Sequence, residues 1–104
     1  MAKYNPTKEL IRFAPGMLSE TGTLKDGIIE FKLTHTDATS TTWSGNYQAI
    51  LNLESFNRKA DGFTESELLS MIPASIYEVF DHHFDVFAHN PVPRPEDIVH
   101  KEPV

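Results

Sequence analysis

The sequence predicts a single α+β domain in which a small antiparallel sheet of about three strands is covered on one face by a long helix. Residues 27–34 alternate between apolar and polar types, which places Ile29, Phe31 and Leu33 on one face of a strand. Residues 42–54 form a second alternating run, and residues 64–90 have the apolar spacing of an amphipathic helix. With 104 residues, the chain is long enough for one hydrophobic core and too short for two.

Composition and charge narrow the classes of function. The formal net charge is -6 and the nine Lys and Arg residues are scattered along the chain, so we expect no nucleic-acid partner. The absence of cysteine excludes a disulfide, a thiolate metal site and a Cys nucleophile. No window approaches the roughly 18 apolar residues of a membrane span, and no signal-peptide pattern is present. We therefore expect a cytoplasmic protein with no membrane partner.

The first sixteen residues predict a short helix, with an extended arm as the alternative. Asn5 and Pro6 are suited to a helix start, and Pro15 followed by Gly16 would end it after Leu10 and Phe13. A helix of this length is stable only when it docks on a larger body.

Turn and strand signals follow. Asp26-Gly27 predicts a tight hairpin turn before the first strand, and the hydroxyl-rich residues 35–44 predict an exposed connection. Along 42–54, the small residues Gly45 and Ala49 leave room for a crossing helix. Ile50 is the one large apolar residue on the polar side of this strand.

The helical segment has a start signal and an interruption. Thr64 and Glu67 form a capping-box pattern after a polar linker, and Asn90-Pro91 would end the helix. Pro73 predicts a kink, or two helices that meet near Ile72. The expected buried face consists of Leu68, Leu69, Ile72, Ile76, Val79, Phe80, Phe84 and Phe87. Residues 1–90 are thus the predicted domain, and the proline-rich residues 91–104 a predicted extended or disordered tail.

The polar side of the same helix raises the question of a metal site. Glu78 and His82 are four residues apart, as are Asp85 and His89, so each pair would lie on one helix face. A metal needs further ligands, and only His35 and His100 offer another imidazole outside the segment. A solvated helix face is the simpler interpretation, and we expect neither a metal nor a cofactor.

Catalysis is not predicted. His83 or His35 would be a possible general base near neutral pH. The sequence has no glycine-rich phosphate loop, no nucleophile elbow and no Ser paired with a base to complete a catalytic set. We therefore expect no catalytic residues and a non-enzymatic function in protein contacts. The candidate contact residues are Ile50, Asn52, Asp81, His82, Asp85, Pro93 and Arg94.

The order of elements resembles that of the tail completion and tail terminator proteins of long-tailed phages. A Trp-led strand, TTWSGNYQAILNLESF, precedes a helix, TESELLSMIPASIYEVF, and the resemblance covers about half of the chain. It implies a virion protein that self-associates into a ring or caps a tail tube through sheet edges. The chain departs from that pattern in its short N-terminal segment and in the proline-rich tail that replaces later strands. The alternative is a small acidic inhibitor or adaptor that docks on a host protein, with a phage as one candidate source; a metal-binding enzyme is the third hypothesis.

Overall fold

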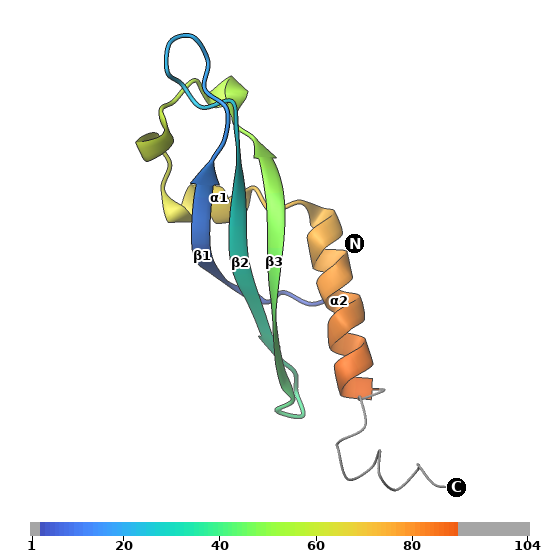
Figure 1. Ribbon diagram of the computed structural model, residues 1–104. Helices are drawn as coiled ribbons and strands as arrows, with labels where there is room; N and C mark the ends of the chain where they lie inside the picture. The colour runs from blue at the N-terminus through green and yellow to red at the C-terminus, as the bar shows by residue number, and fades with distance from the viewer. Residues whose placement is uncertain (1–2, 90–104) are drawn as a thin grey trace, which may run out of the picture.

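The computed structural model describes residues 3–89, which form a three-stranded sheet followed by helices (Figure 1). The sheet is antiparallel with the order β1-β2-β3. Its strands are β1 (Thr7–Pro15), β2 (Asp26–Thr36) and β3 (Thr42–Asn52). Two 3-10 turns, Glu54–Phe56 and Ala60–Gly62, lead to α1 (Glu65–Ser70) and α2 (Ala74–His89). The predicted α+β fold is confirmed, and the proline-rich residues 91–104 lie outside the described part.

The core forms between one face of the sheet and the two helices. Ile29, Phe31 and Leu33 of β2 are all 0% exposed, as the alternation of that strand predicts. Helix side chains from both sides of Pro73 pack on this inner face; they are Leu68, Leu69, Ile72, Phe80 and Phe84. Hydrophobic burial of this one face therefore holds the domain together.

The interruption predicted at Pro73 is confirmed, because α1 ends at Ser70 and α2 begins at Ala74. The break changes the direction of the chain, so that α1 packs against β1 while α2 packs against β3 (Figure 1). No helix within residues 3–89 combines the length and apolar content that crossing a membrane requires.

The helix predicted for the first residues is wrong, since Thr7–Pro15 is a strand at the edge of the sheet. A β-bulge between Leu10 and Arg12 inserts one extra residue, after which Leu10 pairs with Phe31 and Phe13 pairs with Ile29. Both apolar side chains consequently face the core although they are three residues apart. This spacing imitates the helical period, which explains the error.

The hairpin turn predicted at Asp26-Gly27 is also wrong, because these residues begin β2. The chain reverses at residues 19–23, where Gly22 has a φ of +85° and Ser19 N donates to Thr23 O at 2.8 Å. Gly27 has a packing role, since an added Cβ would lie 2.6 Å from a ring carbon of Phe13. Lack of a side chain, and not positive φ, is what this position requires.

Part of the predicted helix stripe is not buried. Phe80 and Phe84 are fully buried, but Val79 is 43% and Phe87 39% exposed. Because α2 lies along β3, the edge strand, the sheet covers only the side of the helix that faces β2. Val79 lies outside that contact, and Phe87 is covered only in part, by the Trp43 ring at 6.5 Å.

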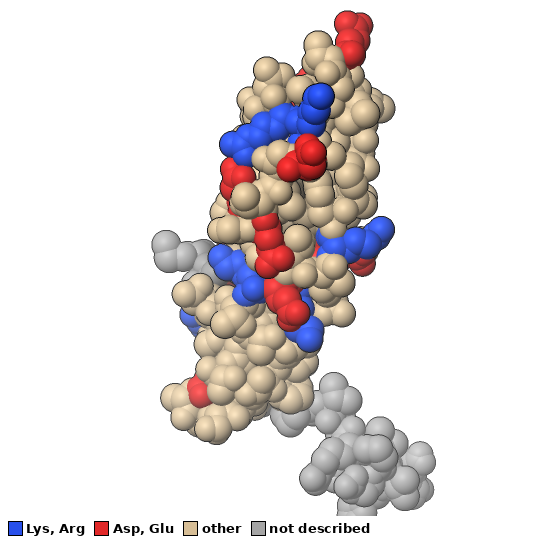
Figure 2. Space-filling view, turned by 90° about the vertical axis from the view of Figure 1, so that its left-hand side faces the viewer, with Lys and Arg blue, Asp and Glu red and all other residues tan. Residues whose placement is uncertain are grey.

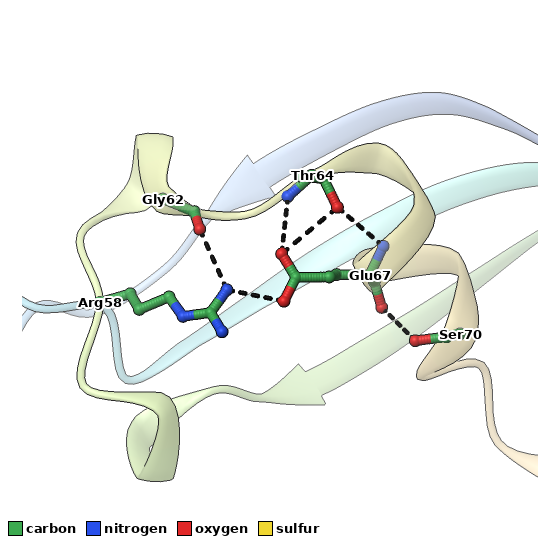
Figure 3. A network of polar contacts seen from close by, with 5 residues as sticks. All are labelled: Arg58, Gly62, Thr64, Glu67 and Ser70. Atoms are coloured by element: carbon green, nitrogen blue, oxygen red, sulfur yellow. Dashed lines mark hydrogen bonds and ion pairs between the residues drawn. The ribbon is translucent and has the colours of Figure 1, made fainter.

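The start of α1 is held by a compact polar network (Figure 3). Thr64 Oγ1 accepts from Glu67 N at 3.1 Å, and the Glu67 carboxylate accepts from Thr64 N at 3.2 Å, which confirms the predicted capping box. Arg58 Nη1 donates to the same carboxylate at 2.7 Å and to Gly62 O at 3.2 Å. The linker before α1 is thereby fixed to the first turn of the helix.

Truncation of Phe84 tests the importance of the core. Phe84→Ala should lower the free energy of unfolding by about 3–5 kcal/mol, because it removes a fully buried ring and leaves a cavity. Urea denaturation followed by circular dichroism measures the change. Val79→Ala, at an exposed site on the same helix, should cost less than about 1 kcal/mol; equal losses for both would contradict the described packing.

The capping network predicts a pH-dependent stability. Hydrogen bonding from Arg58, together with that from Thr64, lowers the pKa of Glu67 from its ordinary value of 4.5. A carboxylate with a lowered pKa in the folded state stabilises the protein above its unfolded pKa, and this contribution is lost as the pH falls. Glu67→Gln keeps the cap geometry without the charge, so the stability gap to wild type should be present at pH 7 and close towards pH 3.

The measurement is urea denaturation of both proteins across this pH range. Glu65→Gln is the matched control, since Glu65 is an exposed carboxylate in the same helical turn, whereas the ion pair with Arg58 is made by Glu67. A gap for Glu67→Gln that does not change with pH would contradict the role given to Arg58.

Candidate interaction surfaces

The outer face of the sheet has no helix on it in the described part of the chain, because α1 and α2 both pack on the inner face. Side chains of cross-strand partners lie on the same face of the sheet, so the strand register gives the rows of residues that cross the outer face. Three of these rows are largely polar. They are Thr7–Thr34–Ser44, Glu9–Lys32–Asn46 and Arg12–Glu30–Gln48.

Glu30 organises the last of these rows. Arg12 Nε donates to its carboxylate at 2.6 Å and Gln48 Nε2 donates at 3.2 Å, and these bonds lower the pKa of Glu30. Such exposed pairs add little to stability. Figure 2 shows the molecule from the β1 side. In this view Lys and Arg are interspersed with Asp and Glu, and few charged residues lie at the lower end.

The fourth row, Ala14–Ile28–Ile50, is apolar. Together with Met17, it forms a first candidate surface, which we call the sheet-end patch. Ile28 pairs directly with Ile50, and Met17 lies beside Ile50 at the mouth of a shallow hollow. Ile50 is 76% and Met17 65% exposed. Asp26, Asn52 and Glu54 line the same hollow, so the patch has a polar, partly acidic rim.

A second candidate surface lies where α2 meets the start of β3, and we call it the helix hollow: Trp43, His82, His83, Val86 and Phe87. These residues line a depression of about 330 Å³. Val86 and Phe87 are exposed, and the Trp43 ring lies 5.9 Å from that of His83 and 6.5 Å from that of Phe87. Gly45 lies beneath the aromatic cluster, where a Cβ would meet the Trp43 ring at 2.6 Å. The space that the sequence suggested for a helix is therefore filled by side chains of β3 itself.

Tyr47 orients one imidazole of this hollow. Its hydroxyl lies 2.8 Å from His83 Nδ1, and the two rings stack with centroids 5.8 Å apart. Burial raises the pKa of Tyr47 to about 12, so the hydroxyl keeps its proton at neutral pH and can donate it. A neutral His83 that accepts this bond carries its own proton on Nε2.

Two residues of the polar cluster bind the N-terminal segment. Asp81 is buried and accepts from the backbone N–H groups of Lys3 and, at 3.1 Å, of Tyr4. Asp85 accepts from Lys3 Nζ at 2.6 Å and from Tyr4 OH at 2.5 Å, and these bonds raise the pKa of both donors. We call this set of contacts the N-terminal clamp; it joins residues 3–4 to α2.

Among the described side chains, no three His, Cys, Asp or Glu residues form a group fit for a metal ion. Asp85 belongs to the clamp, while His82 lies in the helix hollow and Glu78 on the exposed side of α2. His35 packs against the rings of Tyr4 and Phe84, with ring centroids at 4.7 and 5.0 Å. The side chain of His89 and all of His100 lie outside the description.

The contact candidates fall in different places. Ile50 and Asn52 lie at the sheet-end patch and His82 in the helix hollow, whereas Asp81 and Asp85 form the clamp. Pro93 and Arg94 lie outside the described residues. Sequence reasoning missed Ile28 and Val86. The sequence did contain a signal for Ile28: like Ile50, it is an apolar residue at a strand position whose alternation places it on the outer, polar face.

Comparison with known proteins adds no relative. No protein-family model matches this chain, and no curated protein or solved structure matches it either.

The clamp predicts a stability effect at Asp81. Asp81→Ala should lower the free energy of unfolding by about 1–3 kcal/mol, because two backbone N–H groups lose their acceptor. Thermal and urea denaturation measure this loss. Ser75→Ala, at an exposed position of the same helix, is the control and should stay within about 0.5 kcal/mol of wild type. An equally stable Asp81→Ala protein would show that the clamp does not hold the segment.

Proposed function

We propose that this protein is a non-enzymatic assembly protein that works by contacts with other protein chains, including copies of itself. The observation that supports this is the presence of two exposed apolar surfaces at different places, the sheet-end patch and the helix hollow. Clustered exposed apolar residues with polar rims are typical of protein interaction sites.

The number of surfaces favours assembly over simple docking. An inhibitor or adaptor that docks on one host protein needs one contact surface, whereas a subunit of a larger structure needs at least two. The sheet-end patch is on the outer face near the end of β3, and the helix hollow is on the inner side near its start. Two separate surfaces allow each copy to bind two neighbours.

A role as a phage tail or virion component is the specific form of this proposal. It rests on the order of elements, a Trp-led strand followed by a capped helix, which resembles tail completion and tail terminator proteins. β1 and β3 are the edge strands of the described sheet, which is compatible with the sheet-edge contacts that the resemblance implies.

The adaptor hypothesis remains the second candidate, and its support is the acidic rim of the sheet-end patch together with the net charge of -6. It predicts a monomer that binds one foreign partner. The metal-enzyme hypothesis predicts a heat of zinc binding that depends on His82; calorimetry on wild type and His82→Ala tests it.

Light scattering over a wide concentration range tests the assembly role. The wild-type mass should rise with concentration, and Ile50→Asp should weaken this association at least tenfold by placing a charge in an apolar contact. Asn46→Asp, on the same face of the same strand but in a polar row, should behave as wild type. A wild-type protein that stays monomeric at all concentrations would contradict assembly and favour the adaptor.

A further inference from the structure

We infer that the sheet-end patch of one copy docks into the helix hollow of a second copy, with Ile50 as the inserted side chain. This inference rests on the proposed assembly function and adds which two surfaces meet. The contact is head-to-tail: in a pair, one copy keeps a free sheet-end patch and the other keeps a free helix hollow, so each can bind a further neighbour.

The sheet-end patch and the helix hollow of one copy cannot contact each other, because they lie on opposite faces of the sheet. Ile50 and Trp43 lie on the same strand but have opposite parity, so their side chains point to opposite faces of the sheet. Seven residues separate them, which corresponds to about 24 Å along a strand. A neighbouring copy is therefore needed to join them.

The shapes and polarity of the surfaces are complementary. Ile50 projects from the sheet with 76% of its surface exposed, and its branched side chain has little rotamer freedom to lose on docking. The helix hollow is a depression of about 330 Å³, and its lining among residues 3–89 consists of Trp43, Val86, Phe87 and two imidazoles, without Asp, Glu, Lys or Arg. An apolar projection thus meets an apolar recess that holds no charged carboxylate or ammonium group.

The rims add polar complementarity. Asp26 and Glu54 lie beside Ile50, with Lys25 as the neighbouring cation. In the hollow, the Tyr47 hydroxyl lies at His83 Nδ1, and when this hydroxyl is the donor, the neutral imidazole carries its proton on Nε2 and can donate it. A carboxylate on the rim of the patch is the type of acceptor that such a donor binds. A patch facing another patch would instead bring two acidic rims together.

A pair of charge variants tests the head-to-tail contact. Ile50→Asp removes the patch but keeps the hollow, and Val86→Asp removes the hollow but keeps the patch. Each variant alone should be monomeric where wild type associates. An equimolar mixture should form a 1:1 dimer, because one intact patch and one intact hollow remain, and its mass should not grow further. Circular dichroism checks that both variants, changed at exposed sites, remain folded.

Crosslinking gives a second measurement in the associating wild-type background. The chain has no cysteine, so Ile50→Cys and Val86→Cys carry unique thiols, and differently tagged copies should form mixed crosslinks. Thr21→Cys, at the exposed loop before β2, replaces Val86→Cys as the control and should not crosslink to Ile50→Cys.

The outcomes separate this inference from the proposed function. If wild type associates but the mixed variants stay monomeric and the mixed crosslink is absent, the head-to-tail contact is wrong and the assembly role stands. Crosslinks between two Ile50→Cys copies in preference to the mixed product would show a patch-to-patch contact and overturn the inference. A monomeric wild type overturns both.

Discussion

The burial of one sheet face beneath two helices is the constraint on which the rest of this structure depends. Phe31 of β2 and Phe80 and Phe84 of α2 have no exposed surface, and the packing of Phe80 on the Trp43 and Tyr47 rings fixes where α2 runs along β3. Because the sheet has three strands and α2 lies along the edge strand β3, the helix overhangs that edge. The overhang leaves Val86 and Phe87 exposed beside Trp43. The same packing that closes the core thus creates the helix hollow.

Local sequence signals predicted the elements whose pattern is set by neighbours along the chain. The alternation around Phe31, the capping box at Thr64 and the break at Pro73 depend only on nearby residues, and all three are present in the structure. β1 was mispredicted because its bulge is defined by pairing with β2, a distant segment. No local period can show an inserted residue whose effect appears only when two strands meet.

The candidate surfaces were partly predictable for the same reason. Ile50 interrupts a polar row of its own strand, so the sequence alone marks it. The helix hollow requires knowledge of where α2 lies on β3, because its residues come from two elements some forty positions apart in the chain. The structure changes the interpretation of the cluster from Asp81 to Asp85, because the N-terminal segment packs against it. Two of its carboxylates hold Lys3 and Tyr4, which no spacing along the helix indicates.

The position of Trp43 has a practical consequence. It is the only tryptophan of the chain, and its ring contacts Phe80 in the core at 5.5 Å while also lining the helix hollow. Its fluorescence consequently reports on one corner of the molecule, without a label and without a background from other indoles. Separation of α2 from β3 and binding of a partner in the helix hollow both change the surroundings of this ring. Trp43 fluorescence therefore reports both local opening and binding at this site.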